Sequence, residues 1–239
     1  MKWKKWREFT MRKLLKVIKK TLVFVFGTYL VDRFFWKFRH IFDKKWPEGY
    51  LSSSCFSHPH RKLLIKTISK YYPFRKVLEI GCASGPNLYL LARKFPEASF
   101  YGIDISKKAV ETGNNFFQKK GIPNVRLKEG DFEKELKKLK TKSFDVVFSD
   151  AVLIYIDRKR IERVVRKLIR VTKKAVILCE MHQAENLQSI FEGHWTHNFK
   201  KIFGKFIGEE KVKLTKIPFS FWEDKIWGKF GFIIEIVLL

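Results

Sequence analysis

Cysteine is scarce in this chain of 239 residues, which holds three copies and no Cys-x-x-Cys pair. This odd number without paired spacing argues against a disulfide framework and against a zinc ribbon, and is consistent with a reducing compartment. Cys82 and Cys179 lie in a glycine-rich turn and in a strand pattern, where we expect small packing residues rather than nucleophiles. The histidines lack the fixed spacing of a zinc motif, so we expect no metal site.

Acidic residues are also few, since 24 Asp and Glu stand against 50 Lys and Arg, which gives a net charge of +26. Residues 1–70 carry the strongest imbalance, with 18 basic and 4 acidic residues. Such a charge predicts attraction to anionic lipid, nucleic acid or a phosphorylated substrate. A solvated basic surface without a partner is the alternative. The hydrophobic content of 46% predicts a globular chain, large enough for one α/β domain and an extension.

The N-terminal region lacks an apolar run that could span a membrane. Residues 21–31 are eleven residues without charge, which as a helix cover roughly half of a ~30 Å hydrocarbon core. No small-residue cleavage site follows, as a signal peptide would require. Across residues 1–45, apolar and aromatic residues recur at helical spacing with lysine and arginine between them. This predicts a basic amphipathic helix that binds an anionic membrane surface, caps a substrate pocket, or does both.

The remainder of the chain alternates between strand and helix patterns. Residues 46–60 are rich in Pro, Gly and Ser and predict a linker, so we expect an N-terminal extension of residues 1–60 and a domain of residues 61–239. Two C-terminal strands predict an antiparallel pair, with no helix between them. The pattern as a whole predicts an α/β fold with a doubly wound seven-stranded sheet, mostly parallel, with an antiparallel C-terminal strand. The predicted strands are 76–80, 99–105, 124–130, 144–150, 174–181, 211–217 and 231–239, and the predicted helices include 61–72, 87–95, 107–119 and 158–171.

A turn of small residues follows the first strand of this domain. Gly81, Ala83 and Gly85 give a G-x-A-x-G spacing, and Pro86 stands where a dinucleotide fingerprint has its third glycine. Proline has no N–H to offer to a pyrophosphate, and a P-loop is excluded because no Gly-Lys-Ser/Thr follows. The turn therefore predicts a ligand that approaches the backbone closely and brings no phosphate.

Four motifs in order give this chain a family resemblance. The segment Glu79 to Gly85 resembles motif I of the class I S-adenosylmethionine (SAM) dependent methyltransferases, with Ala83 at the usual central glycine. The segments 102–106 (GIDIS), 129–132 (EGDF) and 144–156 (FDVVFSDAVLIYI) resemble the second, third and fourth motifs. The resemblance covers residues 75–182 well and residues 1–60 not at all. It implies a Rossmann-like fold and SAM as the cofactor.

The resemblance also implies roles for individual residues. Asp104 would hold the ribose hydroxyls, Asp131 the adenine amino group and Asp150 the region of the sulfonium. Asp104 and Asp131 have an alternative role as helix-capping residues. The backbone N–H of Phe132 would face the adenine ring, and Glu79 would orient the turn or the amino group. The full set of expected cofactor-binding residues is Glu79, Gly81, Ala83, Gly85, Asp104, Ile105, Asp131, Phe132 and Asp150.

Methyl transfer needs an aligned acceptor, and a hydroxyl acceptor also benefits from a general base. Tyr155, His182 and His194 follow the fourth and fifth predicted strands and are the candidate catalytic residues, with His197 beside them. The basic, tryptophan-rich N-terminus favours a small-molecule or lipid-like acceptor, in a cytoplasmic protein that is free or peripheral to the inner face of the membrane. RNA or protein methylation is the alternative, although the Asn/Asp-Pro-Pro-Phe/Tyr tetrad is absent. A non-catalytic SAM-binding module is a third, and the oligomeric state stays open.

Overall fold

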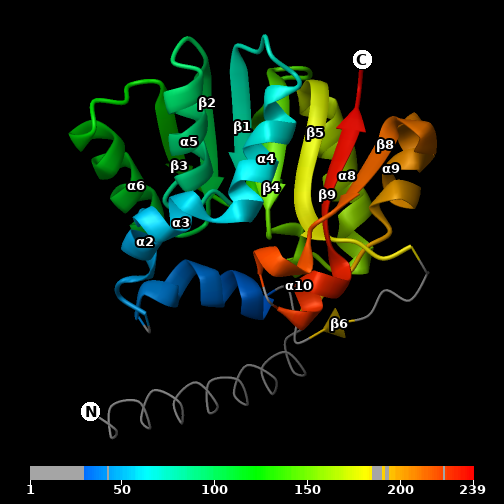
Figure 1. The fold of residues 1–239 in the computed structure, drawn as a ribbon, viewed down its shortest axis with the longest axis horizontal. Coiled ribbons are helices and arrows are strands. Elements are labelled where there is room, and N and C mark those ends of the chain that lie inside the picture. The colour runs from blue at the N-terminus through cyan, green and yellow to red at the C-terminus, as the bar shows by residue number, and fades with distance from the viewer. Residues whose placement is uncertain (1–29, 42, 185–189, 192–193, 223) are drawn as a thin grey trace, which may run out of the picture.

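A seven-stranded sheet forms the centre of the computed structural model, which describes residues 30–41, 43–184, 190–191, 194–222 and 224–239. The strand order is β3-β2-β1-β4-β5-β9-β8 (Figure 1). The first five strands are parallel, and β9 pairs antiparallel with both β5 and β8. The predicted fold is therefore confirmed. The strands are β1 (Lys76–Ile80), β2 (Ser99–Asp104), β3 (Val125–Glu129), β4 (Phe144–Asp150), β5 (Thr172–Met181), β8 (Val212–Lys216) and β9 (Gly231–Val237), and a separate hairpin joins β6 (Ile190–Phe191) to β7 (His194–Trp195).

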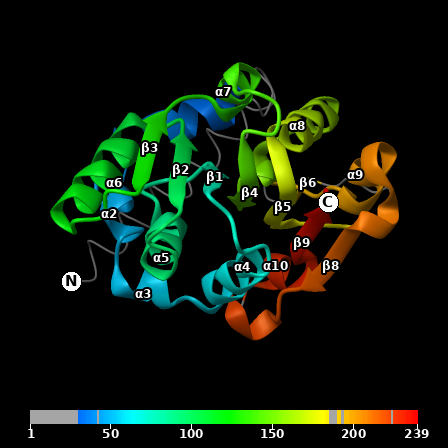
Figure 2. The same ribbon diagram turned by 90° about the horizontal axis from the view of Figure 1, so that it is seen from above.

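Helices cover both faces of the sheet because successive strand residues point to opposite sides. Val77 packs with one layer and the adjacent Leu78 with the other. Figure 2 shows α4 and α5 on one side of the sheet and α7 and α8 on the other. The first layer comprises α4 (Pro59–Ser69), α5 (Pro86–Lys94) and α6 (Lys107–Lys119), and the second comprises α7 (Phe132–Lys138), α8 (Arg158–Val171) and α9 (Phe199–Ile207).

Two segments differ from their sequence-based predictions. The predicted linker, residues 46–60, forms α2 (Trp46–Gly49) and α3 (Ser53–Ser57) and the start of α4. Trp46 is 5% exposed, so burial of an aromatic ring holds this segment against the domain. The stretch between the last two strands was predicted without a helix and contains α10 (Lys225–Phe230), which begins where Asp224 accepts two backbone N–H bonds.

The described part of the N-terminal extension lies at one end of the sheet. Residues 30–41 are helical and lie, with α10, beyond the carboxyl ends of the parallel strands (Figure 1). The rest of the predicted amphipathic helix, residues 1–29, lies outside the described residues. Within the described ranges, none of the helices combines the length and apolar character needed to cross a membrane.

Helix α6 packs so closely on the glycine turn that one of its residues tolerates no side chain. A Cβ at Gly113 would lie 2.5 Å from the carbonyl oxygen of Ser84 and 2.4 Å from Leu127. Gly113→Ala is therefore expected to lower the free energy of unfolding by about 1–3 kcal/mol in urea titrations, although alanine normally stabilises a helix. The exposed Asn115→Ala on the same helix is the control and should not destabilise. Equal stability of the two variants would contradict this packing.

Candidate functional site

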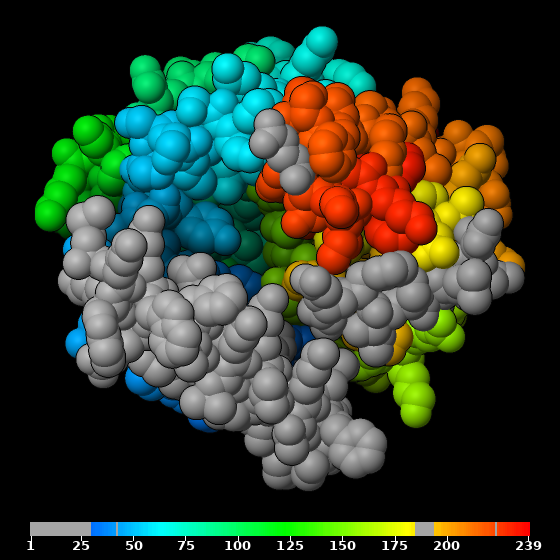
Figure 3. Space-filling model, turned by 60° about the horizontal axis from the view of Figure 1, so that its bottom comes forward, coloured from blue at the N-terminus to red at the C-terminus, as the bar shows by residue number. Residues whose placement is uncertain are grey.

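A cavity of about 200 Å³ lies at the carboxyl ends of β1, β2 and β4. Figure 3 shows this side of the molecule hollowed between the blue and cyan N-terminal elements and the orange-red α10. The helix of residues 30–41 covers the cavity with Asp32, Arg33 and Trp36. The described part of the extension therefore covers a cavity, as the cap alternative expects, and its role as a substrate cap stays a prediction. The strand-end lining consists of Gly81, Ala83, Ile103, Asp104, Ile105, Gly130, Asp131, Phe132, Glu133, Asp150, Ala151, Val152, Tyr155, Ile156 and Arg160, and Trp46 and Tyr50 complete it.

The turn after β1 brings backbone to the cavity wall. Gly81, Ala83 and Gly85 all have positive φ, at 66°, 48° and 81°. A Cβ at Gly81 would lie 2.3 Å from a methyl carbon of Val152, so only glycine fits there. Pro86 is the first residue of α5, and the helix therefore lacks the N–H that a phosphate would use at this position.

Asp104 ends β2 and is held by the glycine turn. Its Oδ2 accepts the N–H of Ala83 at 2.7 Å, and its Oδ1 accepts the N–H of Ser106 at 2.8 Å. Burial raises the pKa of Asp104, and these backbone bonds act in the opposite direction. Each carboxylate oxygen has a second lone pair, so the residue can brace the turn and still accept bonds from two hydroxyls.

Asp131 takes the capping role that was predicted as the alternative to adenine binding. Its Oδ1 accepts the N–H of Glu133 at 2.9 Å and so caps α7, while Oδ2 pairs with Arg33 of the covering helix. The side chain also lines the cavity, as do Ile105 and Phe132. The adenine role of Asp131 stays a prediction, since the capping and pairing bonds occupy part of its carboxylate.

Carboxylates outnumber cations in this cavity and indicate the charge of its ligand. Five carboxylate side chains and two guanidinium groups line it. Arg33 pairs with Asp131 and Arg160 with Glu133, so these four charges cancel, and the further lining carboxylates are Asp32, Asp104 and Asp150, of which Asp150 pairs with Arg61. Hydroxyl donors and a cationic ligand suit such a lining, whereas phosphate groups would meet like charge. The residues present therefore fit SAM, which carries a sulfonium and an ammonium group.

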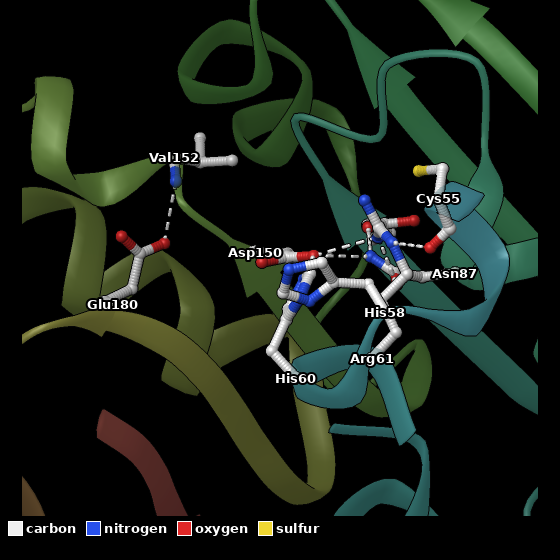
Figure 4. A network of polar contacts seen from close by, with 9 residues as sticks. Cys55, His58, His60, Arg61, Asn87, Asp150, Val152 and Glu180 are labelled. Atoms are coloured by element: carbon white, nitrogen blue, oxygen red, sulfur yellow. Dashed lines mark hydrogen bonds and ion pairs between the residues drawn. The ribbon is translucent and has the colours of Figure 1, made fainter. Parts of the chain in front are cut away.

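Asp150 ends β4 within a network of buried polar groups (Figure 4). Its Oδ2 accepts from Nη1 of Arg61 at 3.0 Å, from Nδ2 of Asn87 at 3.1 Å and lies 3.1 Å from Nε2 of His60. Burial alone would raise the pKa of Asp150, but His60 and Arg61 outweigh it and hold the pKa well below its ordinary value. The carboxylate is therefore ionised and fixed in orientation.

Glu79 joins this network from the end of β1. Its Oε1 accepts from Nδ2 of Asn87 at 2.7 Å, while Oε2 is buried and has no hydrogen-bond partner among the described residues. Burial raises the pKa of Glu79 well above its ordinary value, against the lowering effect of Asn87. Glu79 therefore contacts Asn87, which in turn donates to Asp150, and its predicted role in orienting the turn or the amino group stays a prediction.

Glu180, at the end of β5, fixes the turn that follows β4 (Figure 4). Its carboxylate accepts from Oγ of Ser149 at 2.6 Å and from the backbone N–H groups of Val152, Leu153 and Ile154 at 2.9–3.2 Å. Burial raises the pKa of Glu180 to about 7, against these bonds. These hydrogen bonds hold Val152 beside Gly81, where both residues line the cavity.

A second cavity adjoins the first and shares four of its lining residues. Its shared wall is Trp46, Tyr50, Asp150 and Ala151. The remaining lining residues are Arg39, Asp43, Gly49, Cys55, His58, His60, Arg61, Trp222 and Trp227. The two cavities therefore meet at the end of β4, where the fourth motif of the family resemblance lies.

The structure brings two of the three predicted catalytic residues, Tyr155 and His194, into contact and leaves His182 apart from the cavities. Tyr155 lines the first cavity, and its ring lies 5.2 Å from that of His194. Neither His194 nor His182 is among the described residues that line the two cavities. His182 is 3% exposed and its Nδ1 accepts from the N–H of Phe199 at 3.3 Å, while burial lowers its pKa to about 4. The geometry therefore gives His182 a packing role.

Sequence reasoning missed the residues that the linker segment contributes. His58 and His60 were considered only for a metal, and no group of described residues could hold one. Arg61 was the first residue of a predicted helix without a role. A His-x-His-Arg run immediately before a helical pattern is a local signal of clustered polar side chains, but its partner Asp150 lies 89 residues from Arg61.

Comparisons with known proteins agree with this site. A family described as "Methyltransferase domain" matches residues 75–224. The malonyl-[acyl-carrier protein] O-methyltransferase of Halalkalibacterium halodurans is 28% identical over 138 residues, which are 54% of this chain and 46% of that protein. The trans-aconitate 2-methyltransferase of Deinococcus radiodurans is 32% identical over 81 residues, 34% of this chain and 28% of that protein. The chain thus spans less than half the length of these curated relatives.

Solved structures share the fold at low sequence identity. Magnesium protoporphyrin IX methyltransferase from Synechocystis, with bound SAM, has a TM-score of 0.60 at 16% sequence identity. The matched region covers 88% of this chain and 96% of that protein's chain. A SAM dependent methyltransferase from Aquifex aeolicus has a TM-score of 0.55 at 15% sequence identity. The matched region covers 81% of this chain and 97% of that protein's chain. Together with the family match over most of the domain, these findings identify the chain as a member of the methyltransferase domain family, with the class I fold and SAM as its cofactor.

Proposed function

We propose that this protein transfers a methyl group from SAM to a small-molecule or lipid-like acceptor at an anionic membrane surface. The observation that carries the proposal is the pair of adjoining cavities at the strand ends, one with a surplus of carboxylates and one walled by aromatic rings. When bound, SAM supplies an electrophilic methyl group. Residues 61–239 form the catalytic domain in this proposal, and residues 1–60 its membrane-facing extension.

The chain's own residues bind and orient. Asp104 accepts from ribose hydroxyls, Asp131 and the backbone of Phe132 face the base, and Ile105 packs beside it. Asp150 faces the charged end of the cofactor and Glu79 orients Asn87 behind it, while Tyr155 forms part of the cofactor cavity wall. The small-molecule choice is supported by the relatives, of which one acts on trans-aconitate and another on the malonyl group of malonyl-[acyl-carrier protein].

The membrane part of the proposal depends on the outer face of the covering helix. Leu30, Phe34 and Ile41 are 56%, 63% and 58% exposed and fall within about 40° on a helical wheel. Asp32 and Trp36, which line the cavity, lie on the opposite face. An exposed apolar stripe in the most basic part of the chain is typical of a helix at an anionic interface. We therefore place the protein in the cytoplasm, at the inner face of the membrane.

Two experiments test the proposal. Transfer of a labelled methyl group should favour lipid or small-molecule fractions of an extract, whereas label in RNA or protein would support the alternative function. Phe34→Glu combined with Leu30→Glu should weaken flotation with phosphatidylglycerol vesicles at least about tenfold, because each apolar side chain contributes roughly 1.5–3 kcal/mol when buried. Leu239→Glu, at a residue that is 76% exposed and lies outside the covering helix, is the control. Equal flotation of both proteins would remove the membrane from the proposal.

A further inference from the structure

We propose that the second cavity seats a flat, hydroxyl-bearing acceptor and that His58 is the base that removes its proton, with His60 and Asp150 aligned behind it. This inference rests on the proposed function and names the substrate class of that same site. His58 is the catalytic residue in this scheme because it faces the acceptor. His60 and Asp150 are positioning residues.

The hydrogen-bond chain fixes where the protons lie. Nε2 of His60 is 3.1 Å from Oδ2 of Asp150, and Nδ1 of His60 is 2.5 Å from Nδ1 of His58 (Figure 4). An ionised carboxylate can only accept, so Nε2 of His60 donates to it, and in the proposed relay this is the only proton on the His60 ring. Nδ1 of His60 is then an acceptor, and the shared proton belongs to His58. The lone pair of His58 is thereby left on Nε2, the atom that a base needs.

The surroundings of His58 favour its neutral form. Burial and the positive charge of Arg61 lower its pKa, against the smaller effect of Asp150. The other titratable or charged groups of the second cavity are Tyr50, Cys55, Arg39 and Asp43. A histidine with a lowered pKa is already unprotonated at mildly acidic pH. His58 is also half-buried, so a bound acceptor can reach it, whereas His60 is 5% exposed.

Aromatic rings give the second cavity its shape. The ring of His60 stacks on Trp222 with centroids 4.3 Å apart, and Trp222 stacks on Trp227 at 4.4 Å. Trp46 and Tyr50 form the wall shared with the first cavity. Flat rings bind flat apolar groups and exclude water. Because the rings of His60, Trp222 and Trp227 stack on one another, the acceptor would lie in the second cavity between this stack and the shared wall of Trp46 and Tyr50, where His58 is also a lining residue.

The proton and electron balance of the step is complete without a further reactant. The O–H bond of the acceptor breaks and its proton goes to Nε2 of His58. The electron pair freed on the acceptor oxygen forms the new bond to the methyl carbon. The electron pair of the broken carbon–sulfur bond stays on the sulfur atom. The imidazolium of His58 passes its Nδ1 proton toward His60, where Asp150 stabilises the positive charge, as in a carboxylate–histidine pair. Solvent takes up the proton after the product leaves.

Phenols of graded acidity test the base directly. His58→Gln should lower methylation of phenol at least about 100-fold and that of 4-nitrophenol less than about tenfold, since the latter ionises without help. The exposed Ser57→Gln should leave both rates unchanged. If His58→Gln lowers the methylation rates of both phenols equally, His58 has a structural role. If neither rate falls, His58 is not the base. A wild-type protein that binds SAM and methylates neither phenol would contradict the hydroxyl-acceptor assignment.

Imidazole ¹⁵N NMR of the ligand-free protein supplies a readout independent of activity. We expect His58 at neutral pH to be protonated on Nδ1 and bare on Nε2, with a pKa below the ordinary histidine value. His60→Gln should shift this titration. A His58 protonated on Nε2 would overturn the relay. Calorimetry of the wild-type protein with SAM separates the two proposals. If SAM does not bind, the proposed function is contradicted, whereas the protonation of His58 measured by NMR is unaffected.

Discussion

Asp104→Ala is expected to weaken the binding of SAM at least about 100-fold and to abolish methyl transfer. Hydrogen bonds to a charged group contribute roughly 1.5–3 kcal/mol each, and the carboxylate would hold two ribose hydroxyls. The alanine variant also deprives the N–H groups of Ala83 and Ser106 of their acceptor, which loosens the glycine turn. Titration calorimetry measures the affinity, and circular dichroism the folded fraction.

Asp145→Ala is the matched control for this loss. Asp145 accepts the N–H groups of Arg75 and Lys76 at 2.7 and 2.9 Å, at the opposite end of the sheet. Its removal should lower stability and leave SAM affinity of the folded protein unchanged. If both variants lose affinity equally, the loss is a folding defect. If Asp104→Ala binds SAM like the wild type, the cofactor assignment is wrong.

Arg61→Met is expected to lower the free energy of unfolding by about 3–5 kcal/mol. The guanidinium is 5% exposed and donates to Asp150, to Asn87 at 2.6 Å and to the carbonyl oxygen of Cys55 at 3.1 Å. Without it, the buried carboxylate of Asp150 loses its permanent positive partner. Urea unfolding at neutral pH measures the loss.

The exposed Lys62→Met on the same helix should change stability by less than about 0.5 kcal/mol. Combining Arg61→Met with Asp150→Asn should recover part of the loss, because no uncompensated charge remains. The pKa of Asp150 is lowered in the folded state, so its pairing stabilises the protein above the ordinary carboxyl pKa, and this stabilisation is lost as pH falls. The difference between wild type and Arg61→Met should therefore shrink in acid. A constant difference, or one below 1 kcal/mol, would contradict this role of Arg61.

Local pattern was sufficient for the central part of the fold. The bounds of β1, β4, α6 and α8 agree with the predicted ranges, because short β-branched strands alternate with amphipathic helices and the helices have side-chain caps such as Ser106. The first-cavity lining follows the same logic. Gly81, Ala83, Asp104, Ile105, Asp131, Phe132 and Asp150 all end strands or begin the next segment, and parallel strands bring these ends to one edge.

The rest of the site depends on contacts between distant segments, which no local pattern contains. Trp46 and Tyr50 looked like part of a Pro/Gly/Ser-rich linker, yet their rings pack into a hydrophobic cluster with residues of the domain. His60 meets Asp150 across 90 residues, and the ring of Trp222 joins it from the C-terminal part of the chain. His182 illustrates the reverse case, since its position after β5 is that of a site residue but its ring is buried in packing contacts.

Competition between nucleotides tests the central claim most directly. In calorimetric titrations at fixed salt concentration, SAM should bind the wild-type protein, and excess NAD or ATP should leave the affinity for SAM unchanged. The reason is that the cavity is lined by carboxylates, and that α5 begins with Pro86, which has no N–H for a phosphate. Binding of NAD or ATP that SAM cannot displace would show that the cavity accepts phosphate-bearing nucleotides, and would contradict the account.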